Sequence, residues 1–227
     1  MANRLLKYFV NNGSPRIHKW GNYFDIYEKH FSRFINKEPT ILEIGVSKGG
    51  SLRMWRDYFG PGCKIVGVDI NSDCKKLEDT DIEIFIGDQS DPTLIKNILD
   101  KYSEFDIIID DGSHQMHHLI SSFELLFDSV VSNGVYLLED LQTCYKKKYG
   151  GGLGKKDTFI EYIKTKIDDM NLSKDFDTAD SITFYRRVVV VEKAVRTNFS
   201  DESLKSDFPK SNLCCKKELE RRKNESI

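Results

Sequence analysis

Acidic residues and a histidine follow two strongly apolar stretches of the chain. Phe105–Asp110 is rich in isoleucine and leads into the sequence DDGSH at 110–114, and a later stretch ends in Glu139 and Asp140. If the two stretches are neighbouring parallel strands, their carboxyl ends meet at one edge of a sheet. Crowded carboxylates repel one another, and a hard divalent cation relieves that repulsion. The oxygen atoms of Asp111, Glu139 and Asp140 therefore predict a site for Mg²⁺ or Mn²⁺ rather than for zinc.

His114 stands across a Gly-Ser turn from Asp111, so we expect its imidazole to face an oxygen atom bound to that cation. A hydroxyl group is a poor nucleophile until it loses its proton. A metal lowers the hydroxyl pKa, and a nearby histidine can take the proton. The sequence therefore predicts transfer chemistry at a hydroxyl group, with His114 as the catalytic base. Two plainer interpretations stay open, because Asp-Asp-Gly is a good turn sequence and His114 can also serve as a helix cap or a satisfied polar residue.

A glycine-rich turn follows an earlier apolar stretch, where Gly45 and Gly49 lie between a predicted strand and a predicted helix. Such a turn lets a ligand approach the backbone closely. The spacing does not match the dinucleotide pattern G-x-G-x-x-G, and Glu43 precedes the first glycine. An acid at this position repels a pyrophosphate but attracts a sulfonium with an ammonium group. The loop therefore favours S-adenosylmethionine over NAD.

Two further acids end the next predicted strands. Asp69 lies roughly 20 residues beyond the glycine turn, where an acid can accept both ribose hydroxyls. Asp88 follows the third strand, where it is expected to contact the adenine amino group. The predicted residues for the methyl donor are Glu43, Gly45, Gly49, Ser51, Asp69, Asp88 and Asp110.

Apolar stretches and helical patterns alternate along the chain, which predicts an α/β, Rossmann-like, doubly wound and mostly parallel seven-stranded sheet. The last two strands are joined only by Arg186 and Arg187, a link too short for a helix, so the last strand is predicted to be antiparallel. An amphipathic helix is expected from about Tyr23 to Ile35. The predicted strands are 40–44, 64–69, 82–86, 105–110, 134–139, 181–185 and 188–192, and the other predicted helices are 50–58, 92–101, 117–127 and 159–171.

The composition excludes several classes of protein. A net charge of -2 over 227 residues gives no indication of a nucleic-acid or membrane partner. The N-terminus does not fit a signal peptide, and five irregularly spaced cysteines favour a reducing cytoplasm over a disulfide framework. Lys146–Lys148 precede a glycine-rich loop at 149–155. They are expected to form a solvated face or, alternatively, to steer a phosphorylated substrate.

The sequence resembles the metal-dependent sugar O-methyltransferases of macrolide and rhamnose tailoring, together with the related cephalosporin-hydroxylase-like group. These belong to the class I methyltransferases that use S-adenosylmethionine. The resemblance covers most of residues 18 to 193, and the combination of DDGSH with the Glu-Asp pair is its most specific part. It rests on HKWGNYFDIYEKHF, LEIGVSKGGSLRMWRDYFGPG, IVGVDIN, IGDQSDP, FDIIIDDGSH, GVYLLEDLQTCY, FIEYIKTKIDDMN and SITFYRRVVVVEK.

The resemblance implies a role for each matching residue. It assigns Mg²⁺ to Asp111, Glu139 and Asp140, and the base to His114. It assigns the methyl donor to the acids already named, Glu43, Asp69 and Asp88. Gln142 and Cys144 stand where relatives usually carry histidine or tryptophan and serine, which leaves the substrate open.

Three parts are therefore expected: an N-terminal helical segment at 1–38 that packs on the core, a methyltransferase domain at 39–195, and a polar tail at 196–227. The expected activity is methylation of a sugar hydroxyl, free or nucleotide-linked, in an enzyme that can form a homo-oligomer. The lysine-, isoleucine- and asparagine-rich composition favours a surface or capsular polysaccharide over a macrolide as the destination. Two alternatives stay open: methylation of a catechol or another small molecule, and a non-catalytic module that binds S-adenosylmethionine.

Overall fold

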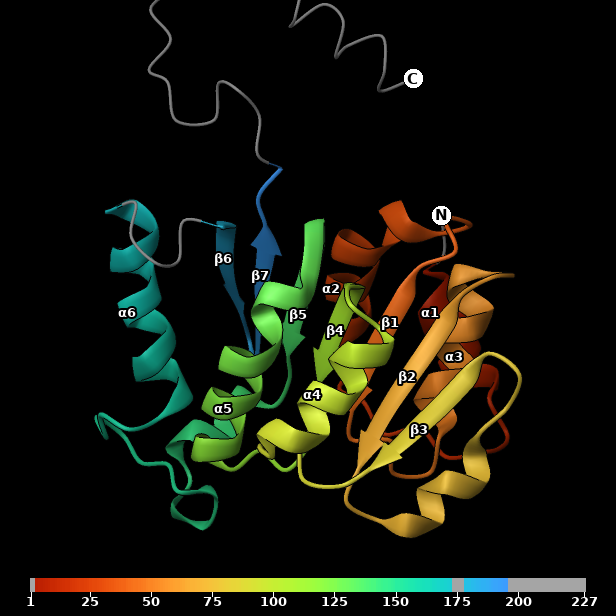
Figure 1. Cartoon of the computed structure of the whole chain (residues 1–227), viewed down its shortest axis with the longest axis horizontal. Coiled ribbons are helices and arrows are strands. Elements are labelled where there is room, and N and C mark those ends of the chain that lie inside the picture. Colours follow the sequence, from red (N-terminus) through yellow and green to blue (C-terminus); the bar gives the residue numbers. More distant parts are fainter. Residues whose placement is uncertain (1–2, 173–177, 196–227) are drawn as a thin grey trace, which may run out of the picture. The chain divides into compact units, whose positions relative to one another are not determined.

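The computed structural model describes residues 3–172 and 178–195, so the predicted polar tail at 196–227 lies outside the described residues. One seven-stranded sheet forms the centre of the described part, with the strand order β3-β2-β1-β4-β5-β7-β6 (Figure 1). Only β7 runs antiparallel to its neighbours β5 and β6. The predicted fold class is confirmed. The strands are β1 Thr40–Ile44, β2 Lys64–Asp69, β3 Ile82–Ile86, β4 Phe105–Asp110, β5 Val130–Leu138, β6 Ala179–Tyr185 and β7 Val188–Lys193.

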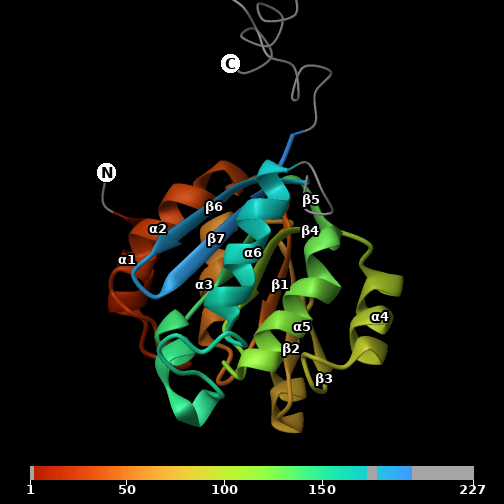
Figure 2. The same ribbon diagram turned by 90° about the vertical axis from the view of Figure 1, so that its left-hand side faces the viewer.

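Helices cover both faces of the sheet (Figure 2). The first three pack on one face and the last three on the other, which gives the three layers expected of a doubly wound fold. None of the helices in the described residues is long and apolar enough to cross a membrane. The helices are α1 Arg4–Asn11, α2 Tyr23–Phe31, α3 Gly50–Phe59, α4 Pro92–Lys101, α5 Met116–Leu126 and α6 Phe159–Asn171.

Strand β4 illustrates why the centre of the sheet is so apolar. Ile107 and Ile109 pack in the core beneath α1, α2 and α3, whereas Ile108 packs in the core beneath α4, α5 and α6. Side chains alternate between the two faces of a strand, so a strand covered on both faces needs apolar residues at successive positions. The isoleucine run is the sequence signature of this double burial.

Two predicted boundaries differ from the structure by more than two residues. Strand β5 begins at Val130 rather than at 134, because Val130 pairs with Phe105 before a register irregularity in the ladder. Helix α2 ends at Phe31, and a 3-10 turn at Ser32–Phe34 completes the segment that the periodicity assigned to one helix.

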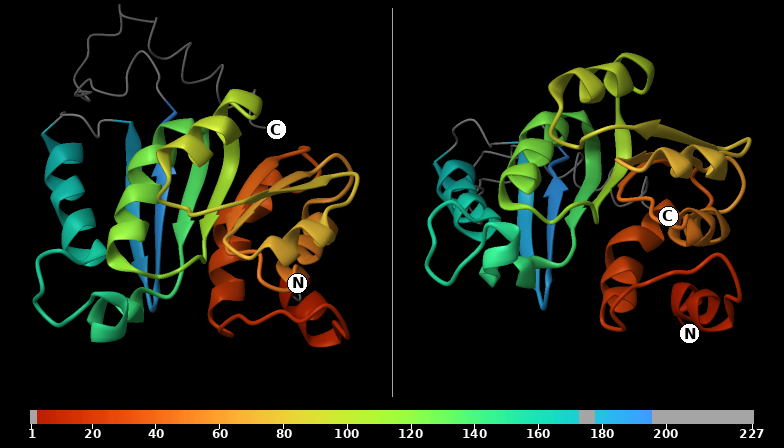
Figure 3. Two further views of the ribbon diagram at one scale, coloured as in Figure 1. Left: turned by 60° about the horizontal axis from the view of Figure 1, so that its bottom comes forward. Right: turned by 90° about the horizontal axis from the view of Figure 1, so that it is seen from below.

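Helix α2 is anchored in the core by aromatic contacts. The rings of Tyr27 and Trp55 meet edge to face at 5.0 Å, and Phe31 also contacts Trp55. The segment between α1 and α2 is thereby held near the carboxyl ends of the strands. Figure 3 brings this end of the sheet forward, where the connections after the parallel strands gather. In an open α/β sheet this edge is where ligands bind.

Candidate active site

The turn after β1 approaches the turn after β4 closely. Gly45 has φ +95, and a side chain there would collide with the carbonyl group of Asp111. Glycine is therefore required for both its conformation and its lack of a side chain. Gly49, the residue before α3, also has a left-handed conformation with φ +74. These two glycines let the turn fold against its neighbours and open the space above it to a ligand.

Glu43 lies beneath this turn and is fully buried. Its Oε2 accepts a hydrogen bond of 3.0 Å from the Ser51 hydroxyl, and its Oε1 lies 3.8 Å from the Lys19 ammonium. Burial raises the pKa of Glu43 to about 7, against the opposing charge of Lys19. The acid thus lies under the loop, as the sequence predicted. It acts on the cavity through Ser51 and Lys19, since its own side chain does not line the wall.

Asp69 and Asp88 lie at the far end of the same cavity. Asp69 organises its turn by accepting the backbone amides of Ser47 and Asn71, both at 2.8 Å. Asp88 accepts the amide of Ser90 at 2.8 Å, and these backbone and hydroxyl bonds to Ser90 lower its pKa. Both acids line the cavity and are held by their own turns, which suits the predicted contacts with ribose and adenine.

The cavity has a volume of about 620 Å³ and connects these acids with the ends of β4 and β5. It is large enough for a nucleoside ligand beside a second small molecule. Of the residues predicted to bind the donor, Gly45, Ser51, Asp69 and Asp88 line it. Those that do not line it are Glu43, Gly49 and Asp110.

Asp110 is fully buried and lies away from the cavity wall, unlike Asp69 and Asp88. It is fully buried on the α5 side of the sheet, where its Oδ2 accepts the Ser122 hydroxyl at 2.6 Å and its side chain meets the Gln89 amide at 3.2 Å. Its Oδ1 also accepts the Gly112 amide at 3.3 Å. Burial raises the pKa of Asp110, although these hydrogen bonds by themselves lower it. We therefore assign Asp110 to positioning the turn that carries Asp111 and His114, instead of to direct contact with the donor.

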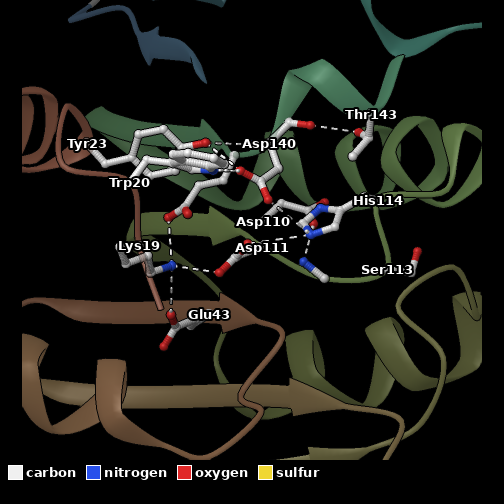
Figure 4. A network of polar contacts seen from close by, with 12 residues as sticks. Lys19, Trp20, Tyr23, Glu43, Asp110, Asp111, Ser113, His114, Asp140 and Thr143 are labelled. Atoms are coloured by element: carbon white, nitrogen blue, oxygen red, sulfur yellow. Dashed lines mark hydrogen bonds and ion pairs between the residues drawn. The ribbon is translucent and has the colours of Figure 1, made fainter. Parts of the chain in front are cut away.

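A lysine that sequence analysis did not select occupies the middle of the acid cluster (Figure 4). The Lys19 ammonium lies 2.7 Å from Asp111 Oδ2 and 2.8 Å from Glu139 Oε1. Its side chain is only 2% exposed. Burial by itself lowers the pKa of Lys19, but the charges of Asp111, Glu139 and Glu43 together raise it well above its ordinary value. The lysine is therefore a fixed positive charge inside the site.

Glu139 is held almost entirely by the N-terminal segment. Its Oε1 accepts the Tyr27 hydroxyl at 2.6 Å in addition to the Lys19 ammonium. Burial raises the pKa of Glu139, and the negative charge of Asp111 adds to the effect. A buried carboxylate with this neighbour is costly to ionise unless a cation is present.

Asp140 and His114 form the other side of the cluster. Asp140 Oδ1 accepts the Tyr23 hydroxyl at 2.5 Å and the Trp20 indole N–H at 3.1 Å. Although burial opposes it, these hydrogen bonds lower the pKa of Asp140. The His114 Nε2 lies 3.7 Å from Asp140 Oδ2 and 3.8 Å from Asp111 Oδ1.

These three residues suit a divalent cation. Asp111, His114 and Asp140 each offer one ligand atom, and the three atoms lie within 4.8 Å of one another. Oxygen donors with one imidazole are compatible with Mg²⁺ or Mn²⁺. The buried Nδ1 of His114 has no hydrogen-bond partner among the described residues, and the imidazole is placed by its backbone, by the Tyr149 ring and by the two acids near Nε2. Glu139 is not part of this set, because its Oε1 is engaged by Lys19 and Tyr27.

Seven non-glycine residues in the described part of the chain have a positive φ, and three of them line this cavity. His114 has φ +58, Asp140 has φ +57, and Ser47 and Arg187 have φ +52 and +73. Non-glycine residues rarely adopt such angles, and each costs of order 1–3 kcal/mol unless the surroundings enforce it. Three of these four residues line the cavity, and Arg187 stacks 3.6 Å over the ring of Trp20, which also lines it. Two of the strained residues, His114 and Asp140, belong to the proposed metal and base site.

The functional residues that sequence analysis missed all come from the N-terminal segment. Lys19 and Trp20 precede α2, whereas Tyr23 and Tyr27 belong to its buried face. A usable signal was present in the two tyrosines, because a buried phenol needs a hydrogen-bond partner that phenylalanine does not. Lys19 offered no comparable signal, since its partners lie 92 and 120 residues away in sequence.

The fold is that of a class I methyltransferase. Three features define it: the sheet order with an antiparallel seventh strand, the glycine turn after β1, and the acid at the end of β2. Residues 25–174 match the FtsJ-like methyltransferase family, and the chain belongs to this family.

Sugar O-methyltransferases are among its most similar relatives. The chain is 39% identical over 165 residues to the demethylmacrocin O-methyltransferase of Streptomyces fradiae, an alignment that covers 67% of this chain and 41% of that enzyme. It is 38% identical over 152 residues to the mycinamicin VI 2''-O-methyltransferase of Micromonospora griseorubida, covering 63% of this chain and 38% of that enzyme. The chain therefore spans about two fifths of the length of these curated relatives.

A solved structure supports the same relationship. The MycE methyltransferase of mycinamycin biosynthesis, determined in complex with Mg, SAH and mycinamycin VI, superimposes with a TM-score of 0.77 at 29% identity. The match covers 90% of this chain and 56% of that chain.

Proposed function

We propose that this chain transfers a methyl group from S-adenosylmethionine to a sugar hydroxyl, with a divalent cation bound beside the acceptor. The observation that carries the proposal is the single cavity that joins Asp69 and Asp88 at one end to Asp111, His114 and Asp140 at the other. A further relative is an 8-demethyl-8-alpha-L-rhamnosyl tetracenomycin-C 2'-O-methyltransferase of Streptomyces olivaceus, 36% identical over 163 residues, and the MycE methyltransferase was solved with Mg and SAH; both support this assignment.

The two ends of the cavity suit different parts of the reaction. Asp69 and Asp88 bind the nucleoside of the donor, and the turn at Gly45 lets its sulfonium approach the backbone. A bound divalent cation lowers the pKa of a coordinated hydroxyl group. His114 then takes the proton from the acceptor hydroxyl, because its Nε2 faces the same point as the carboxylates of Asp111 and Asp140. S-adenosylmethionine, when bound, would supply the methyl group: a carbon–oxygen bond would form to the deprotonated acceptor as the carbon–sulfur bond breaks and S-adenosylhomocysteine leaves.

Asp111 and Asp140 are the first two ligands of the proposed cation. Asp111 and Asp140 already face one another with His114 between them. Glu139 is a third candidate through its Oε2, because its other oxygen accepts the hydrogen bonds from Lys19 and Tyr27. We propose that Glu139 Oε2 completes the ligand set with Asp111 and Asp140, which leaves His114 free to act as the base.

The first experiment follows formation of S-adenosylhomocysteine from S-adenosylmethionine with a panel of sugars, nucleotide-linked sugars and catechols, in the presence of Mg²⁺. His114→Ala should lower turnover by about 10²–10⁴, the contribution of a general base, with donor affinity nearly unchanged. His117→Ala is the matched control, because His117 is an exposed histidine on α5. A chelator should also stop the reaction.

Undiminished turnover in His114→Ala would refute the role of the base, and undiminished turnover in chelator would refute the role of the cation. Donor binding without any turnover would favour a non-catalytic module.

We further propose that the acceptor sugar is linked to a nucleotide. Several basic residues at or near the cavity have no ion pair to a carboxylate in the described part of the chain, namely Arg16, Lys48, Lys146–Lys148 and Arg187. The Lys148 ammonium lies over the ring of Tyr149, and that ring contacts the ring of His114 at 6.2 Å. Most other described surface cations, such as Lys96 with Asp100, do have such partners. Free positive charges beside the acceptor end favour a phosphorylated acceptor.

Replacing Lys146, Lys147 and Lys148 together by alanine tests whether the acceptor is nucleotide-linked. The KM for a nucleotide-linked sugar should rise by about tenfold, with little change for the corresponding free sugar. Lys156→Ala is the control, since Lys156 is exposed and follows the same loop. Equal effects on both acceptors would refute electrostatic recognition of phosphate. A surface polysaccharide as the destination stays a prediction from composition, because the relatives' names point to macrolide and related acceptors. The homo-oligomer also stays a prediction.

A further inference from the structure

The acid cluster has two sides, which share the carboxylate of Asp111. On one side, Asp111 Oδ2, Glu139 Oε1 and Glu43 Oε1 face the Lys19 ammonium at 2.7, 2.8 and 3.8 Å. On the other side, Asp111 Oδ1 faces the Nε2 of His114, together with Asp140. A carboxylate that bridges two cation positions is the arrangement found in two-metal sites.

The ammonium on the first side is firmly held in place. Lys19 is 2% exposed, so it has no alternative partner in water. Its neighbour Trp20 is fixed by Asp140 on one side and by the Arg187 guanidinium on the other. The chain just before it passes so close to α3 that a side chain at Gly50 would collide with the Arg16 carbonyl. The segment that carries Lys19 is therefore held by Arg187 and by the close approach to α3 in addition to its contacts with the acids.

We infer that the Lys19 side chain fills one of two cation positions in the acid cluster, so that the site takes a single divalent cation, on the Asp140–His114 side of Asp111. This inference rests on the proposed metal site and goes beyond it by assigning Lys19 as a positioning residue. The lysine occupies the place that a second metal ion would otherwise take between Glu43 and Glu139. It thereby leaves the Oδ1 side of Asp111, next to His114 and Asp140, for the divalent cation.

The charges support a single added cation. Glu43, Asp111, Glu139 and Asp140 offer four carboxylates to the site, and Lys19 supplies one positive charge. One divalent cation brings the cluster close to balance, whereas without Lys19 two divalent cations can be accommodated. Removing the ammonium also removes a like charge that repels any metal ion bound to Asp111.

The test is a titration with Mn²⁺ of the full chain and of Lys19→Met, which keeps the length and removes the charge. Calorimetry and the electron paramagnetic resonance signal of free Mn²⁺ give stoichiometry and affinity without any turnover. Wild type should bind one Mn²⁺ per chain. Lys19→Met should bind two, or bind the first at least about tenfold more tightly. Lys19→Arg should behave as wild type, and Lys156→Met is the control because Lys156 is exposed and does not line the cavity.

Separate outcomes test the separate claims. One Mn²⁺ in wild type and one of unchanged or weaker affinity in Lys19→Met, with the thermal melt and SAH binding preserved, would overturn the inference alone. No Mn²⁺ binding by wild type would instead overturn the proposed metal-dependent function. If Lys19→Met fails to fold, anomalous scattering from Mn²⁺ in wild-type crystals decides the matter. The inference requires manganese at Asp140 with the Lys19 ammonium still on Glu139, and manganese between Glu43 and Glu139 would refute it.

Discussion

Replacing Glu43 by glutamine isolates the electrostatic cost of a carboxylate buried beneath the donor turn. The side chain is fully buried, and burial raises its pKa from 4.5 to about 7. Each unit of pKa shift corresponds to about 1.4 kcal/mol, so ionised Glu43 costs the folded state about 3 kcal/mol. That is a large fraction of the roughly 5–15 kcal/mol by which a domain is stable.

The direction of the pH dependence follows from proton binding. The folded protein holds the Glu43 proton more tightly than the unfolded chain does, because the pKa is raised on folding. Raising the pH from about 4.5 to about 7 therefore lowers the free energy of unfolding. The stabilising contribution is fully present below the unfolded pKa and is lost once the pH has passed the folded pKa. Glu43→Gln is neutral at every pH and should show no such loss.

Urea unfolding at pH 4.5, 5.5, 6.5 and 8 measures this difference. The free energy of unfolding of wild type, taken relative to Glu43→Gln, should fall by about 3 kcal/mol over that range. Glu104→Gln is the matched control, because Glu104 is exposed and its replacement should leave the profile parallel to that of wild type. Parallel profiles for wild type and Glu43→Gln would show that the Lys19 ammonium fully compensates the burial, which would refute the reasoning.

Three other substitutions test the packing around the site. Gly45→Ala should destabilise the fold by more than about 2 kcal/mol and weaken SAH binding, because it combines left-handed strain with a collision at Asp111. Thermal melting measures the first effect and calorimetry the second. Trp55→Ala should cost about 3–5 kcal/mol in urea unfolding, since the indole is fully buried between aromatic rings. Tyr27→Phe should cost about 1–3 kcal/mol and weaken Mn²⁺ binding, because it removes a hydrogen bond to Glu139; unchanged stability and metal affinity would exclude that role.

Much of the fold could be predicted from local signals in the sequence. Runs such as Phe105–Asp110 identify strands buried on both faces, and the alternation with helices determines the parallel topology. The short Arg186–Arg187 link correctly implied an antiparallel pair. Because parallel strands bring their carboxyl ends together, the chain order alone also predicted that Asp111 and Asp140 would meet.

Strand geometry explains why Asp110 lies away from the cavity. Residues two apart in a strand face the same side, so Asp110 follows Ile108 into the core against α5. Asp111 lies just beyond the strand and turns toward the cavity. Applying the two-residue period to the end of β4 would have separated the buried acid from the exposed one.

The N-terminal segment was harder to predict, because the polar partners of Lys19 lie 92 and 120 residues away in the sequence. The aromatic residues of α2 were correctly expected to cover the core. Their spacing gave no indication that two of their hydroxyl groups would extend past the core edge to Glu139 and Asp140. The same helix thus packs apolar rings against Trp55 and directs polar atoms into the site.

This double use links stability to chemistry in a specific way. The Tyr27 ring contacts Trp55 on α3, and its hydroxyl donates to Glu139 at the end of β5. A rigid phenol cannot shift at one end without moving at the other, so loosening the contact between α2 and α3 displaces the hydrogen bond that orients the acid. Lys19 precedes the same helix and approaches the same carboxylate. The geometry of the acid cluster therefore depends on how well α2 is docked. Core substitutions beneath it should change metal affinity as well as stability, whereas equally destabilising ones beneath α4 should change stability alone.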